Sequence, residues 1–283
     1  MSDSPKIVFQ KERKVNEILR DAFDVLKFNY RDFFQKNIKI VALFFILEIV
    51  AYMFLFYFKY NYLHYGYGFD MFTGVSLVLN FIFILYFTIL EVVTFIYFKY
   101  YINDEQINLK TYKKEVYDIL PSLLGLNIMM LFLMMIGFIL LIIPGIYLFV
   151  SLSLSPVILI YEGKKTFESF KHSIKIIKNN WWSVFSILFF LFLILLLFNF
   201  SYSFTVNLYS NFKALFTESN SYTANVLNDP VLFFLFFILL IVNSIIYVYA
   251  AITLLMLYFN IMEKRTHSNL YSEIETIGTD FEN

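Results

Sequence analysis

The sequence predicts an all-α, polytopic helical membrane protein with six transmembrane helices, arranged as three hairpins with interfacial amphipathic helices between them. Of its 283 residues, 60% are hydrophobic and only 16% are charged. A soluble domain carries roughly 45–50% apolar and about 25% charged residues. The excess apolar surface cannot be buried in a soluble core, so lipid must solvate it. The apolar residues are also gathered into six runs that alternate with charged segments.

The chain begins with a charged segment. Residues 11–36 carry apolar side chains at helical spacing, such as Ile18, Ala22 and Val25, with charged residues between them. This pattern predicts an amphipathic helix. It would lie either in the headgroup region of the membrane or against the cytoplasmic ends of the other helices. No apolar stretch of a cleavable signal precedes it, so we assign residues 1–37 to a cytoplasmic amphipathic segment.

Two apolar runs, residues 38–58 and 75–97, form the first predicted hairpin. Each run is long enough to cross a hydrocarbon core of about 30 Å as a helix. A second charged segment follows at residues 104–120, again with apolar side chains at helical spacing. We expect this segment to lie on the same side of the membrane as the N-terminal one.

The second predicted hairpin consists of residues 123–143 and a short run at residues 146–160. Pro144 and Gly145 separate the two runs as a turn signal. Because basic segments flank the pair on both sides, the hairpin must begin and end at the same surface. The two runs therefore either both cross the membrane, which gives six spans, or both form a re-entrant hairpin, which gives four. We favour six.

A third charged amphipathic segment covers residues 164–180, and residues 181–202 and 231–262 form the last hairpin. At 1.5 Å per residue the final run would be roughly 48 Å long, which exceeds the thickness of a hydrocarbon core. We expect it to tilt, to kink near Asn243, or to emerge from the bilayer.

The distribution of Lys and Arg fixes the orientation. Twenty of the 22 cationic residues lie before or at the start of the first span, between spans 2 and 3, between spans 4 and 5, or after span 6. The positive-inside rule then places both termini of a multi-pass protein on the cytoplasmic side of the inner or plasma membrane. The expected organisation is a cytoplasmic segment (1–37), a six-span domain (38–262) and a polar cytoplasmic tail (263–283).

Two carboxylates fall inside the predicted spans, Glu48 near the middle of the first and Glu91 in the cytoplasmic third of the second. A charge at the centre of a span costs roughly 2.5–3.5 kcal/mol or more, so such residues are functional hypotheses. No Lys, Arg or His occupies a span centre, so we expect protonated carboxyls. One interpretation is a proton- or cation-linked site, or a carboxylate that binds a lipid amine. The other is a packing residue that hydrogen-bonds to a neighbouring helix, or, for Glu91, that snorkels to the interface.

The sequence lacks the motifs of soluble enzymes. It has no Cys, its three His residues are far apart, and it contains no Gly-rich phosphate loop and no Gly-x-Ser-x-Gly. Its zero net charge gives no reason to expect a nucleic-acid partner. We therefore expect a non-enzymatic protein without a cofactor or metal. Its expected partners are membrane lipids, with a membrane-protein partner or a second copy of the chain as further alternatives.

A loosely spaced pattern runs through residues 143–185. A Pro-Gly-aromatic turn is followed by a Pro in the next span, a Glu-Gly pair, a Ser in a basic helix, and an Asn-x-Trp sequence that leads into a span. These positions are Pro144, Gly145, Tyr147, Pro156, Glu162, Gly163, Ser173, Asn180 and Trp182. The pattern resembles a largely uncharacterised group of bacterial six-span membrane proteins related to the membrane domain of glycerophosphoryl diester phosphodiesterases.

In the phosphodiesterases of that group, a separate soluble domain performs the hydrolysis. Only residues 263–283 follow the last span here, so the resemblance implies a protein without phosphodiesterase activity. It also implies that Glu162, near basic residues, either holds the amphipathic helix in place or binds a ligand. We expect a lipid-binding or scaffold protein, with a solute or lipid transporter that uses Glu48 as the alternative. An intramembrane enzyme ranks third, because no nucleophile–base pair is visible.

Overall fold

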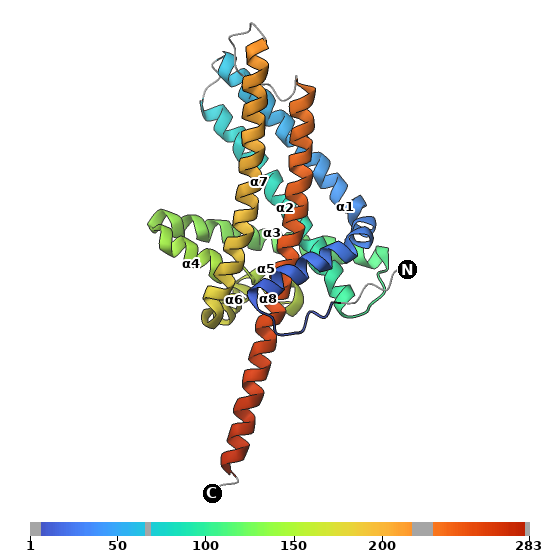
Figure 1. Cartoon of the computed structure of the whole chain (residues 1–283), viewed down its shortest axis with the longest axis vertical. Coiled ribbons are helices and arrows are strands. Elements are labelled where there is room, and N and C mark those ends of the chain that lie inside the picture. Colours follow the sequence, from blue (N-terminus) through green and yellow to red (C-terminus); the bar gives the residue numbers. More distant parts are fainter. Residues whose placement is uncertain (1–6, 66–68, 217–228, 281–283) are drawn as a thin grey trace. The chain divides into compact units, whose positions relative to one another are not determined.

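The computed structural model describes residues 7–65, 69–216 and 229–280, and every regular element within these ranges is helical (Figure 1). Six helical stretches of the described chain are long and apolar enough to cross a membrane. The predicted all-α membrane class is therefore confirmed. The elements are α1 (Val15–Tyr65), α2 (Phe69–Ile102), α3 (Leu109–Leu140), α4 (Ile142–Leu152), α5 (Ser155–Glu162), α6 (Thr166–Ile177), a 3-10 turn (Lys178–Asn180), α7 (Trp181–Phe216) and α8 (Pro230–Asp280).

Charged segments and spans share continuous helices. The N-terminal charged segment and the first span together form α1, because neither Gly nor Pro interrupts the sequence from Val15 to Tyr65. The second charged segment continues into the third span as α3, which runs through Pro121 at the cost of one backbone hydrogen bond. At the other end of the chain, α8 continues as a helix to Asp280, through most of the expected polar tail.

The chain forms two compact units. Unit 1 consists of Met1–Gln35, Val92–Leu188 and Tyr249–Asn283, and unit 2 of Lys36–Glu91 and Phe189–Val248. Unit 1 thus contains the whole of α3, α4, α5 and α6. The helices α1, α2, α7 and α8 each contribute residues to both units.

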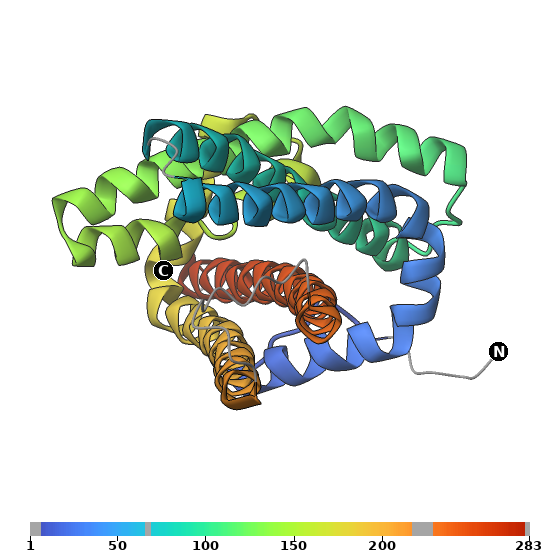
Figure 2. The ribbon, with the colours of Figure 1, turned by 90° about the horizontal axis from the view of Figure 1, so that it is seen from above.

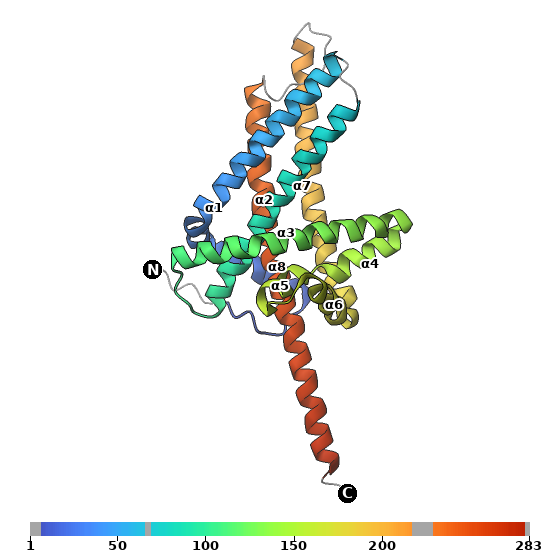
Figure 3. The same cartoon turned by 180° about the vertical axis from the view of Figure 1, so that it is seen from behind.

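In unit 1, α4 doubles back along the C-terminal half of α3 (Figure 2). The two helices come close together at a pair of glycines. A Cβ on Gly137 would lie 3.0 Å from the Cα of Gly145, and a Cβ on Gly145 would lie 2.5 Å from the ring of Phe138. The hairpin runs across the direction of the C-terminal part of α8 (Figure 3). Its tip is apolar and exposed, with Ile139 at 80% and Ile143 at 79% exposure, as suits contact with lipid.

The turn of this hairpin lies earlier than predicted. The helix is interrupted at Leu141, whose backbone is extended. Pro144 and Gly145 lie in the first turn of α4. Proline is tolerated there because the first N–H groups of a helix have no intrahelical partner. Gly145 therefore permits the close approach of α3 rather than forming the turn.

The fourth predicted span is divided into two short helices. The run at residues 146–160 breaks at Ser153 and Leu154, between α4 and α5. Pro156 lies at the start of α5, where its ring does not disturb the helix. Gly163 ends α5 with a left-handed backbone (φ 64°), a conformation that glycine adopts without strain.

In unit 2, α7 and α8 run side by side (Figures 1 and 3), and Asp229 ties the end of one to the start of the other. Its carboxylate accepts hydrogen bonds from the backbone N–H groups of Val231 (2.9 Å) and Leu232 (3.3 Å), which begin α8. It also binds Lys213 and Tyr209 of α7. Burial alone would raise the pKa of Asp229, but the bonds from Lys213 and from the two backbone amides outweigh it and lower that pKa.

Candidate functional site

Glu48, the first predicted site residue, lies on α1 in unit 2 and is buried among aromatic rings. It is 2% exposed, and within the described parts of the chain its Oε2 has no hydrogen-bond partner. Phe45 and Tyr52 share its face of α1. Tyr52 stacks on Phe83 at 4.3 Å between ring centroids, and Phe45 packs on Tyr86 at 5.9 Å. A carboxyl oxygen without a hydrogen bond in such surroundings destabilises the fold.

Glu91, the second predicted residue, lies on α2, also in unit 2. It is 5% exposed and has interaction partners within the protein. Tyr247 of α8 lies close enough to interact with it electrostatically, and Phe87, one turn earlier on α2, packs on that tyrosine at 4.7 Å. The side chain is therefore buried and engaged with the protein.

The remaining predicted residues all lie in unit 1, where they serve different contacts. The hydroxyl of Ser173 on α6 donates a buried hydrogen bond of 2.7 Å to the backbone carbonyl of Ser151 on α4. That carbonyl is among the last of α4, which have no partner within the helix. Trp182, by contrast, is 74% exposed and makes edge-on contacts with Trp181 and Phe185.

Glu162 connects three helices of unit 1. Its Oε2 lies 2.5 Å from the Nζ of Lys164 and 2.7 Å from the Nδ1 of His172 on α6. Its Oε1 accepts a hydrogen bond of 2.9 Å from the hydroxyl of Tyr258 on α8. Both carboxylate oxygens are thus engaged with the protein itself. This is the arrangement that a structural role requires, and a ligand would have to displace one of these partners.

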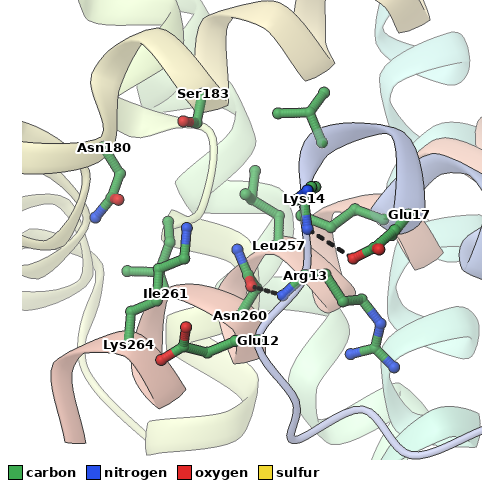
Figure 4. Close-up of a pocket in the computed structure, with 12 residues that line it drawn as sticks. Glu12, Arg13, Lys14, Glu17, Asn180, Ser183, Leu257, Asn260, Ile261 and Lys264 are labelled. Atoms are coloured by element: carbon green, nitrogen blue, oxygen red, sulfur yellow. Dashed lines mark hydrogen bonds between the residues drawn. The ribbon is translucent and has the colours of Figure 1, made fainter. Parts of the chain in front are cut away.

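A polar cavity of about 530 Å³ lies beside another of the predicted residues, Asn180 (Figure 4). This volume falls within the range of about 300–1,000 Å³ that is common for ligand pockets. Three segments of unit 1 line the cavity: the chain leading into α1, the start of α7 and the C-terminal part of α8. Lys14, Ser183, Asn260 and Lys264 are among its lining residues.

Arg13 fixes one wall of this polar cavity. Its buried guanidinium donates hydrogen bonds of 2.9 Å to the carbonyl of Phe9 and to the carboxylate of Asp21, so its charge is compensated internally. Its backbone N–H donates to the Oδ1 of Asn260 at 2.6 Å. That bond leaves the Nδ2 of Asn260 facing the cavity (Figure 4), where none of the described residues accepts a hydrogen bond from it.

A second cavity of about 540 Å³ adjoins the first, since Asn180 and Ser183 line both. Its wall is largely apolar and includes Ile143 and Tyr147 of α4. Trp181 also lines this apolar trough, and its ring stacks on Phe185 at 5.2 Å between centroids. The indole Nε1–H is buried and finds no acceptor in the described structure.

Of the residues that line the two cavities, Asn180 was predicted from the sequence, whereas Arg13, Trp181 and Asn260 were not. An available signal was the position of Asn260, which is one of two amides in the apolar run at residues 231–262 and lies near the end of a run too long for the hydrocarbon core. Within the described ranges, no group of three or more His, Asp or Glu side chains is arranged to hold a metal ion. The side chains that line the two cavities offer hydrogen bonds, ion pairs and apolar contacts.

Comparison with known proteins assigns the chain to a family. The model of an uncharacterised protein family, UPF0259, matches residues 70–249. The chain belongs to the UPF0259 family. The matched region includes Glu91, Glu162 and Asn180, whereas Glu48 and Asn260 lie outside it.

Relatives with sequence similarity are UPF0259 membrane proteins of Buchnera aphidicola subsp. Acyrthosiphon pisum, from strains Tuc7, 5A and APS. Each is 48% identical over 56 residues, which is 20% of this chain and 23% of the relative. The alignments thus span less than a quarter of these UPF0259 proteins. No solved structure matches the chain.

Proposed function

We propose that this UPF0259 protein is a non-enzymatic lipid-binding or accessory protein of the cytoplasmic membrane, with both termini in the cytoplasm. The observation that carries the proposal is the pair of adjoining cavities in unit 1, one polar and one apolar. A lipid has the same division into a polar head and apolar chains. The cationic segments at 11–36 and 164–180, which the positive-inside rule assigns to the cytoplasm, contribute Lys14 and Asn180 to these walls.

The surface of α6 supports a position at the membrane interface. Lys171 and Lys175 are exposed, and Phe167 on the same helix is 66% exposed. Exposed lysines together with an exposed aromatic ring suit the headgroup region. Each cation there adds about 1 kcal/mol of attraction to an anionic surface.

The resemblance of residues 143–185 to the membrane domain of glycerophosphoryl diester phosphodiesterases agrees with a role beside phospholipids. In unit 1 the residues of that pattern form helix contacts and cavity walls. Ser173 joins α6 to α4, Glu162 joins α5 to α6 and α8, and Asn180 lines both cavities. We therefore propose that the pattern marks a lipid-binding module rather than a hydrolytic one.

A transporter that uses Glu48 is the second candidate. One observation favours it: the Oε2 of Glu48 is buried without a hydrogen bond. A bound cation or a proton would neutralise the charge of that carboxylate. The lipid-binding proposal assigns Glu48 a packing role in unit 2 instead. The two proposals therefore differ in how the protein responds to Glu48→Gln.

Lipid analysis by mass spectrometry of the full chain, extracted in native membrane discs, tests both proposals. We expect the wild-type protein to retain a lipid subset that differs from the bulk membrane. We expect Glu48→Gln to leave that subset unchanged, and the double charge reversal Lys171→Glu with Lys175→Glu to reduce its anionic share. Bulk composition in the wild-type discs would refute lipid binding, and a subset lost only in Glu48→Gln would support the second candidate.

A further inference from the structure

We propose that the polar cavity and the apolar trough of unit 1 form one phospholipid site that selects a zwitterionic headgroup with a primary ammonium. The headgroup would occupy the polar cavity, and one acyl chain would lie along the trough. This inference rests on the proposed lipid-binding function and names the class of lipid that is bound.

The polar cavity presents donors suited to a phosphate. Asn260 is 3% exposed, and the bond from Arg13 to its Oδ1 holds its Nδ2–H₂ toward the cavity. The side chains of Asn180 and Ser183 line the same space, and neither has a hydrogen-bond partner among the described residues. These donors open onto the cavity, where a phosphodiester would supply two charged oxygens that accept strongly.

The charge of the polar cavity favours a headgroup that is itself neutral overall. Lys14 and Lys264 contribute two cations, and Glu12 and Glu17 contribute two anions to the same wall. Both glutamates also have partners within the protein, since Glu17 accepts the backbone N–H of Lys14 through its Oε2, so a ligand cation would add to these contacts. Arg13 does not alter this balance, because Asp21 pairs with it. A headgroup with only negative charge would gain from the lysines but be repelled by the glutamates.

A primary ammonium suits these glutamates better than a quaternary one. It carries three N–H donors, which carboxylate oxygens accept in charge-assisted hydrogen bonds. A quaternary ammonium has no N–H to donate and is recognised mainly by aromatic faces. The side chains that line the polar cavity are carboxylate, amide, hydroxyl, amine, guanidinium and aliphatic groups, with no aromatic ring among them.

Along the wall from the polar cavity into the apolar trough, polar side chains give way to apolar ones, as the headgroup of a phospholipid gives way to its acyl chains. Asn180 and Ser183 line both cavities and mark their junction. Trp181 lines the trough beside that junction. Its Nε1–H is covered by protein and has no acceptor among the described residues, so we expect the indole to shift when the ester carbonyl of a bound lipid accepts a hydrogen bond from it. Beyond it, Ile143 and Ile146 offer apolar contact for the chain. The polar-to-apolar sequence of this wall thus parallels phosphate, ester and hydrocarbon.

The test uses the full chain in lipid nanodiscs of equal phosphatidylethanolamine, phosphatidylcholine and phosphatidylglycerol, with native mass spectrometry of the lipids that stay bound. Asn260→Asp keeps the oxygen that accepts the Arg13 N–H but replaces the amide donor with a second carboxylate oxygen, which repels phosphate. Trp181→Phe keeps a ring for stacking and removes the Nε1–H. The matched control is Asn16→Asp, which makes the same charge change in unit 1 outside both cavities.

We expect the wild-type protein and Asn16→Asp to retain phosphatidylethanolamine preferentially. Retention should fall about tenfold or more in Asn260→Asp, and several-fold in Trp181→Phe. Equal retention in both variants and the control, with selective binding by wild type, would overturn this site and leave the lipid-binding function standing. Preference for phosphatidylglycerol or phosphatidylcholine would overturn the headgroup assignment. A wild-type protein that retains no lipid selectively would refute the proposed function itself.

Discussion

Replacing Gly137 by alanine tests the packing of the α3–α4 hairpin. The new Cβ would lie 2.9 Å from the Cδ1 of Leu148, 3.0 Å from the Cα of Gly145 and 3.2 Å from its N. The leucine methyl can rotate away, but the two Gly145 atoms belong to the backbone, so α3 and α4 must separate locally. Overpacking of this kind costs about 1–3 kcal/mol.

Gly125 supplies the matched control on the same helix, because a Cβ there meets no atom within 4 Å. Both Gly→Ala changes gain helix propensity, by up to about 1 kcal/mol. Their difference therefore isolates the contact, and we predict that Gly137→Ala is less stable than Gly125→Ala by about 1–3 kcal/mol.

Unfolding by SDS in mixed micelles measures this difference, with far-UV circular dichroism reporting helix loss. Tryptophan fluorescence adds a local signal from Trp181, which stacks on Tyr147 of α4 with ring centroids 6.2 Å apart, together with a contribution from the exposed Trp182. Equal midpoints for the two alanine variants would refute the close approach of the two helices.

Three further predictions use the same unfolding assay. Because the pKa of Asp229 is lowered in the folded protein, its stabilising effect is present at neutral pH and is lost as the pH falls through the folded-state pKa. Asp229→Asn should thus cost about 1 kcal/mol at pH 7 and flatten the acid limb of a series from pH 7 to about 3. Glu162→Gln removes the charge that binds His172 and should lower the free energy of unfolding by roughly 1–2 kcal/mol. The control Glu168→Gln, on the exposed surface, should change stability little. Equal losses in the two variants would contradict the structural role of Glu162. Glu48→Leu removes a buried oxygen without a hydrogen bond and should raise stability by about 1–3 kcal/mol, and a fall instead would point to a compensating partner for that carboxylate.

The periodicity and length of the apolar runs were enough to predict the fold class, because lipid exposure leaves a compositional signal in every span. Local breaks were harder to predict. In the sequence, Pro144 predicts the loop between two helices. A proline is equally compatible with the first turn of a helix, and Pro144 lies in the first turn of α4. The break at Ser153 and Leu154 does have a signal, because Pro156 cannot donate a backbone hydrogen bond to the carbonyl of Leu152, the last residue of α4. The predicted span at residues 146–160 does not take this proline into account.

The cavities could not be predicted for a different reason. Arg13 and Asn260 are 247 residues apart in the chain, and only the folding of unit 1 brings them together. Trp181 resembles an interfacial aromatic in sequence, since a tryptophan at the start of a span is typical of the membrane boundary. Its buried Nε1–H becomes visible only when the ring is seen stacked on Phe185. Glu48 could be chosen as a candidate from the sequence, because a charge inside a predicted span costs free energy. The aromatic rings that surround it could not be predicted.

Photocrosslinking tests the central claim most directly. The full chain, reconstituted with phosphatidylethanolamine that carries a diazirine near its headgroup, is irradiated and digested, and the lipid-modified peptides are mapped. Occupation of the unit 1 site predicts adducts concentrated at residues 12–18, 180–183 and 257–264, and their loss in Asn260→Asp. Adducts concentrated around Glu48, or spread evenly over the exposed apolar helices, would contradict a lipid site in unit 1.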